Sequence, residues 1–108
     1  MQDLKKAEML QELLETYPVL LVQFGSESCM PCQGIRNRVE DWQKGHPQVG
    51  GVYISIEMFP ELAAQEGVFT VPCLSVYVEG KQTLREAGYF SVNQILSGAE
   101  RYLTLLDC

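Results

Sequence analysis

The chain has 108 residues, 46% of them hydrophobic, so it is long enough to build one globular domain over residues 1–108 without a disulfide staple. Its net charge of −6 disfavours nucleic acid and anionic membrane as partners, and no apolar run approaches the ~20 residues that a bilayer-spanning helix needs. We therefore expect a monomer whose cysteines are available for chemistry.

The N-terminal half predicts a helix, a buried strand and a second helix. Apolar residues recur at helical spacing from Leu4 to Tyr17 with glutamates between them, which differs from the unbroken apolar core of a signal peptide. We infer a cytoplasmic protein from this start. Val19 to Phe24 has the length and composition of a buried strand, and Gly25 to Ser28 connect it to a helix from Pro31 to about Lys44.

Three strands, a short helix and a last helix are predicted in the second half. Proline opens the short helix, Pro60 to Glu66, and Gly67 follows its end. Ser91 followed by Gln94 matches a capping box that opens the last helix. The predicted strands are Val52 to Ile56, Val71 to Val78 and Thr83 to Ala87, the last two joined by a hairpin at Glu79 to Gln82. The order αβαβαββα predicts an α/β fold whose first half has parallel strands and whose second half is an antiparallel hairpin.

The segment Cys29-Met30-Pro31-Cys32 places two thiols between the first predicted strand and the start of a helix. The unpaired N–H groups and the macrodipole at a helix N-terminus stabilise a thiolate, so Cys29 is the candidate nucleophile. Cys32 follows about one helical turn later, close enough to form a disulfide but further inside the helix, where burial disfavours its thiolate. It is the candidate resolving cysteine.

Two other interpretations of this motif stay open. A CxxC pair can be half of a zinc site, and Cys73 and Cys108 could complete an all-cysteine set of ligands. Neither of them has a neighbouring cysteine or histidine, so the spacing favours redox chemistry, and we expect neither metal nor cofactor. The motif could also be two ordinary buried cysteines.

The element order with a CxxC after the first strand resembles the thioredoxin family over essentially the whole chain. The resemblance is carried by Val22-Gln23-Phe24 leading to the CxxC motif, by Val71-Pro72, by Glu79-Gly80-Lys81 and by Gly88. It implies a thioredoxin-like fold, with a mixed central sheet flanked by helices, and a cis peptide bond before Pro72, whose ring packs against the redox pair and excludes metal. It also implies that Val71 offers its backbone to an extended substrate, as an added strand would require. Met30 and Pro31 are further expected substrate contacts.

The chain departs from the family pattern around the motif. Thioredoxins carry a tryptophan where this chain has Ser28, and a buried aspartate, which helps to deprotonate the resolving cysteine, where it has Gln23. The lysine that pairs with that aspartate appears as Tyr53. Glutamine cannot accept a proton at neutral pH, so Glu27 is the nearest alternative carboxylate unless it is simply an exposed loop residue.

We predict a thiol–disulfide oxidoreductase in which the Cys29 thiolate attacks a substrate disulfide and Cys32 resolves the mixed disulfide. The expected substrates are disulfide-containing proteins or small-thiol compounds, and a separate reductase or a small thiol would supply electrons. The alternative is a thioredoxin-fold adaptor or redox-sensing module with little reductase activity, and a metal-binding module ranks third. Cys73 could tune the dithiol or form another bridge, or it could be a buried small residue. The last helix should carry Cys108 about 20 Å or more away from Cys29.

Overall fold

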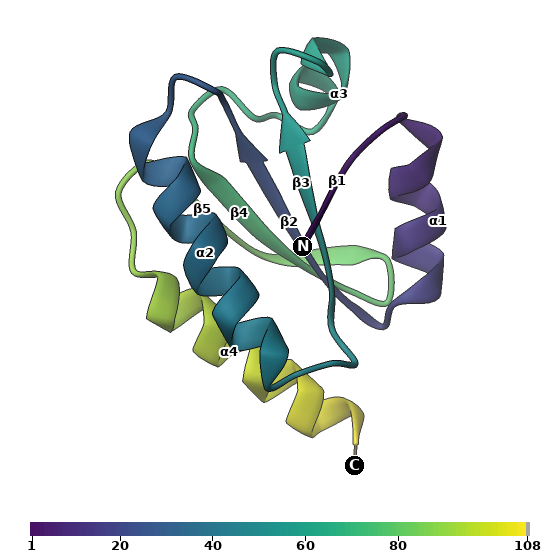
Figure 1. Cartoon of the computed structure of the whole chain (residues 1–108). Coiled ribbons are helices and arrows are strands. Elements are labelled where there is room, and N and C mark those ends of the chain that lie inside the picture. Colours follow the sequence, from purple (N-terminus) through teal and green to yellow (C-terminus); the bar gives the residue numbers. More distant parts are fainter. Residues whose placement is uncertain (108) are drawn as a thin grey trace.

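A five-stranded mixed sheet lies at the centre of the molecule, in the order β1-β3-β2-β4-β5. The computed structural model in Figure 1 describes residues 1–107. β2 (Val19–Gly25) is the middle strand and is buried along its whole length. It pairs in parallel with β3 (Gly50–Ser55) and antiparallel with β4 (Cys73–Val78). The edges are β1 (Gln2–Asp3), parallel to β3, and β5 (Lys81–Ala87), antiparallel to β4.

Four helices cover the two faces of this sheet. α2 (Met30–Lys44) and α4 (Val92–Leu106) pack side by side on one face (Figure 1). α1 (Glu8–Thr16) and α3 (Pro60–Gln65) pack on the opposite face. A hydrophobic core lies on each face of the sheet. Alternate side chains of β2 pack into the two cores, because successive residues of a strand point to opposite faces. Leu20, Val22 and Phe24 face α1 and α3, whereas Val19 and Leu21 face α2 and α4.

The predicted fold class is confirmed, and the structure adds one strand to the predicted order. The helix expected from Leu4 begins only at Glu8, and Gln2–Asp3 form the edge strand β1, so the order is βαβαβαββα. Leu4 is 2% exposed, and its N–H donates to the Tyr53 carbonyl oxygen at 2.9 Å. A two-residue strand has no periodicity of its own, and it exists only because β3 offers a free edge.

The other predicted elements are present with small shifts at their ends. Turn residues Glu79 and Gly80 both have positive φ, 51° and 82°, as a tight two-residue hairpin requires, so Lys81 and Gln82 already belong to β5. The Ser91 hydroxyl accepts a hydrogen bond from the Gln94 N–H at 3.2 Å, so the predicted cap of α4 is confirmed. Among the helices of residues 1–107, none combines the length and the apolar character needed to cross a membrane.

Candidate active site

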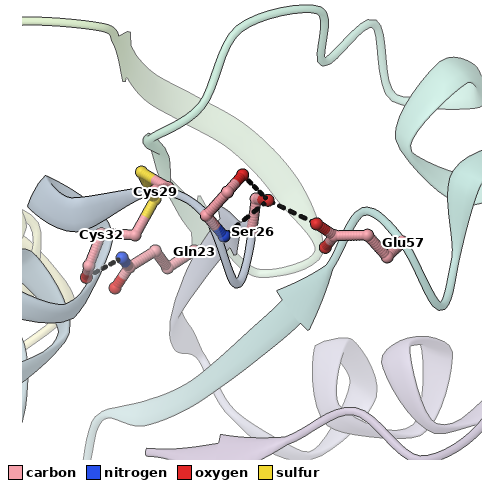
Figure 2. The surroundings of a disulfide bond; sticks show 6 residues. Gln23, Ser26, Cys29, Cys32 and Glu57 are labelled. Carbon is pink, nitrogen blue, oxygen red and sulfur yellow. Dashed lines mark hydrogen bonds between the residues drawn. A yellow bond between two sulfur atoms is a disulfide. The ribbon is translucent and has the colours of Figure 1, made fainter.

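Cys29 and Cys32 form a disulfide at the N-terminus of α2, with their Cα atoms 5.4 Å apart (Figure 2). Cys29 is the N-cap residue of α2 and is half-buried, whereas Cys32 lies in the first turn and is 1% exposed. The two sulfur atoms therefore differ in their access to solvent. When the bond is reduced, the N-terminal N–H groups of α2 favour the thiolate of Cys29, and burial disfavours the thiolate of Cys32.

The sheet brings Val71 and Pro72 to the same end of the molecule as the disulfide. Phe24 of β2 pairs with Cys73 of β4, so the residues just before Cys73 lie beside the connection that leads to Cys29. The peptide bond between Val71 and Pro72 is cis. The carbonyl oxygen of Pro72 accepts from the Gly88 N–H at 2.9 Å, whereas the backbone of Val71 forms no hydrogen bond within residues 1–107. Val71 thus has a free donor and a free acceptor for an added strand.

Gln23 lies fully buried beneath the motif (Figure 2). Its Nε2 donates to the backbone carbonyl oxygen of Cys32 at 2.9 Å, and its Oε1 has no partner among the described residues. The amide therefore ties β2 to the first turn of α2. Because an amide does not titrate, the side chain beneath Cys32 at this position is not a proton acceptor.

A carboxylate that the sequence analysis missed holds the loop before Cys29. Glu57, in the connection between β3 and α3, accepts a hydrogen bond from the Ser26 hydroxyl (Figure 2). It also accepts one from the Ser55 hydroxyl at 3.1 Å. The hydroxyls of Ser26 and Ser28 are 3.1 Å apart. The hydrogen bond from Ser26 lowers the pKa of the Glu57 carboxyl below its ordinary value. Nothing near Glu57 in the sequence signals this role, because its partner Ser26 is 31 residues away.

The remaining predicted site residues divide into exposed and buried ones. Glu27 is exposed, and its side chain has no ion pair or hydrogen bond within the part of the chain that the structure describes. Pro31 is also exposed, and Met30 is 88% exposed beside the disulfide. Cys73 is a free thiol with 1% exposure, and burial raises its pKa. Its position in β4 is thus that of a buried small residue.

Two structural findings bear on the other expectations for the cysteines. Cys108 lies outside the described residues, so the structure places no distance between it and Cys29. Across residues 1–107, no three His, Cys, Asp or Glu side chains gather in a group able to hold a metal ion.

The family model described as thioredoxin matches residues 1–101 of the chain. The chain belongs to the thioredoxin family. A thioredoxin from Streptomyces clavuligerus is 33% identical over 70 residues, which cover 65% of each chain. Thioredoxin 1 of Synechococcus elongatus is 26% identical over 94 residues, 86% of this chain and 88% of the relative. Thioredoxin-2 of Pyricularia oryzae is 22% identical over 80 residues, and the match spans only 47% of that longer relative.

The solved structures of thioredoxins agree with the fold. The thioredoxin of Fasciola hepatica superposes with a TM-score of 0.83 at 26% identity, over 94% of this chain and 98% of that one. A mutant thioredoxin from Halobacterium salinarum gives a TM-score of 0.85 at 23% identity, over 94% and 88% of the two chains. At the level of the family, the predicted function is confirmed: this is a thioredoxin-type thiol–disulfide oxidoreductase with a CxxC disulfide between Cys29 and Cys32.

Proposed function

We propose that this chain reduces disulfides with Cys29 as the nucleophile and Cys32 as the resolving thiol. The observation that carries this assignment is the unequal burial of the two sulfur atoms: Cys29 caps α2 and is half-buried, whereas Cys32 is 1% exposed. A substrate sulfur can therefore approach only the first cysteine.

The reaction moves two electrons from the dithiol to the substrate. The Cys29 thiolate attacks one substrate sulfur, so a Cys29–substrate disulfide forms, the substrate S–S bond breaks, and the leaving thiolate takes a proton from solvent. The Cys32 thiolate then attacks the Cys29 sulfur, which closes the disulfide between them and releases the second substrate thiol. Since Gln23 cannot take the proton of Cys32, that proton must pass to solvent or to an exposed carboxylate such as Glu27.

The substrate segment would bind in an extended conformation along Val71. The unpaired backbone of Val71 supports this placement, because strand addition needs one free N–H and one free carbonyl oxygen. Met30 and Pro31 are exposed at the start of α2 and offer apolar contacts to the same segment. Pro72, immediately before β4, would hold the substrate strand beside the sulfur atoms.

A disulfide-containing protein or a small disulfide is the proposed substrate, and a separate reductase or a small thiol is the proposed electron donor. We place the protein in the cytoplasm as a monomer. A free thiol such as that of Cys73, in a protein whose disulfide is used for chemistry, is typical of a reducing compartment.

The order of alkylation of the reduced protein tests the assignment of the nucleophile. Cys29 should react first with iodoacetamide, with a pKa below the ~8.5 of a free thiol, because the N-terminus of α2 stabilises its thiolate. Cys29→Ser should abolish reduction of a protein disulfide, whereas the control Cys73→Ser should keep it. An unshifted thiol pKa at Cys29, or a Cys29→Ser variant that remains active, would exclude this function.

A second candidate is an adaptor or redox-sensing module with little reductase activity. The buried amide of Gln23 favours it, because no carboxylate at that position assists the resolving step. Multiple turnover of a protein disulfide with an external reductant decides between the two. An enzyme should reduce many equivalents of the protein disulfide per chain, whereas a sensor should stop after about one equivalent per chain.

A further inference from the structure

A pocket of about 630 Å³ opens beside Cys29, between the start of α2 and the N-terminal segment of the chain. Its wall includes Cys29, Met30, Tyr53 of β3, and Lys5 just after β1. Neither Val71 nor Pro72 lines it, so the pocket shares only Cys29 and Met30 with the strand-addition site proposed above. A ligand in this pocket would reach the nucleophilic sulfur from a second direction.

Tyr53 is fixed in this wall by its neighbours. A Cβ atom on Gly25 would collide with the Tyr53 hydroxyl, so only glycine at position 25 leaves room for the ring. The Arg36 guanidinium stacks 4.7 Å from the centre of that ring, and Asp3 holds Arg36 through an ion pair of 2.7 Å. Tyr53 lines the pocket, and its hydroxyl, which lies over Gly25, has no hydrogen-bond partner within residues 1–107, so it is free to donate to a ligand.

Two further groups of the pocket wall are unpaired. The Lys5 ammonium and the Glu27 carboxylate are exposed, and neither has an ion pair or side-chain hydrogen bond within the described part of the chain. Asp3 also lines the pocket, but its carboxylate is already engaged by Arg36. A carboxylate ligand would satisfy Lys5 and Tyr53 together, and an ammonium group would pair with Glu27.

Resting on the proposed function, we propose that this pocket binds a low-molecular-weight disulfide or thiol that carries a carboxylate and an ammonium group, as cysteine-containing amino acids and short peptides do. The Cys29 thiolate attacks one sulfur of the small disulfide, the small S–S bond breaks as a mixed disulfide forms, and one small thiolate leaves and takes a proton from solvent. Cys32 gives its proton to solvent and then attacks the Cys29 sulfur, which releases the second small thiolate and closes the protein disulfide. In excess small thiol the same steps run backwards, so the pocket is also an entry point for electrons.

Oxidised glutathione and the neutral bis(2-hydroxyethyl) disulfide are suitable probes. The rate constant for oxidation of the reduced protein is measured with each probe. The rate constant with oxidised glutathione divided by that with the neutral disulfide reports recognition of the charged groups. Lys5→Gln should lower the ratio of glutathione to neutral rate about five- to tenfold, as the loss of one charge-assisted hydrogen bond predicts. Tyr53→Phe keeps the ring under Arg36 but removes the donor, and it should lower the ratio about threefold.

Lys6→Gln is the matched control, because Lys6 is an exposed neighbour outside the pocket and carries the same charge. Its ratio should equal that of the unmodified protein. Equal ratios in the Lys5 and Lys6 variants would overturn the proposed pocket and leave only an effect of net charge. A protein that reduces a protein disulfide but fails to react with oxidised glutathione would also overturn the pocket. Failure of the unmodified protein to reduce a protein disulfide would instead contradict the proposed function, so the two failures are distinct.

Binding without reaction gives an independent measurement. In a Cys29→Ser, Cys32→Ser protein, reduced glutathione should shift the NMR signals of Lys5 and Tyr53 and leave those of Val71 unmoved. Shifts confined to Val71 and its neighbours would move the small thiol to the strand-addition site and refute the pocket.

Discussion

Gln23 is the residue that most distinguishes this site chemically. It is fully buried, it donates to the Cys32 carbonyl oxygen, and its own Oε1 is unpaired within residues 1–107. An unsatisfied buried acceptor costs roughly 1–3 kcal/mol, so the amide is retained at a cost to stability. It holds the first turn of α2 in place but cannot accept the proton of Cys32. We therefore expect slow resolution of the mixed disulfide, accelerated as the pH rises.

Gln23→Asp should speed turnover near neutral pH. Burial raises the pKa of a carboxyl group, so an aspartate at this depth could accept the Cys32 proton within the working range. Turnover of a protein disulfide between about pH 6 and pH 9 measures the effect, and Gln23→Asn is the matched control because its shorter amide does not titrate. If the aspartate variant turns over no faster than the parent, proton transfer from Cys32 does not limit this protein.

At the scale of elements, a hydrogen bond between two side chains connects β4 to the end of α3. The Tyr77 hydroxyl on β4 donates to Glu66 Oε1, at the C-terminus of α3, at 2.7 Å. Tyr77 is 8% exposed, and burial together with the bond to Glu66 raises the pKa of its phenol to about 12. This contact anchors α3 on the sheet, next to the Glu57 loop and the strand that begins after Pro72.

The raised pKa of Tyr77 predicts a loss of stability in alkali. The unfolded phenol ionises near pH 10, whereas the folded one stays neutral to about 12, so its stabilisation is complete below pH 10 and is lost as the pH rises from 10 to 12. The loss should approach about 2 kcal/mol in the free energy of unfolding, once solvent screening of the phenol is allowed for. Urea unfolding across this range measures it.

Tyr77→Phe should reduce that alkaline decline, because the phenol whose raised pKa causes the predicted loss is removed. Tyr89→Phe is the control, since the Tyr89 side chain is fully exposed and its loss should leave the decline unchanged. An equally steep decline in the Tyr77→Phe protein would show that other groups cause the alkaline loss.

At the scale of the whole molecule, the topology separates one reactive cysteine pair from a buried thiol. Digestion of the oxidised monomer without reduction should release a peptide linked between Cys29 and Cys32. Cys73 should resist alkylation until the protein unfolds, because burial both excludes the reagent and raises the pKa of the thiol. Cys108 is predicted from the sequence to react readily. An abundant linkage of Cys73 to either motif cysteine would contradict this arrangement.

The sequence by itself determined the features that depend on near neighbours. The apolar run of β2, the spacing of Cys29 and Cys32, the turn at Glu79 and the cap of α4 at Ser91 are all encoded within a few residues, because strand and helix periods and turn chemistry are local properties. Together with Val71-Pro72, they were sufficient to predict the family fold and the redox pair.

Only the tertiary structure decided the contacts between segments that are distant in the chain. Four contacts join such segments. They are the pairing of β1 with β3, the hydrogen bond from Ser26 to Glu57, the hydrogen bond from Gln23 to the Cys32 carbonyl, and the packing of Tyr53 over Gly25. Such contacts leave no periodic pattern, because they arise only when the sheet brings its strand ends together. The pocket beside Cys29 is lined by three segments that are distant in the chain, and so the chemistry that we propose for it could not be read from local sequence.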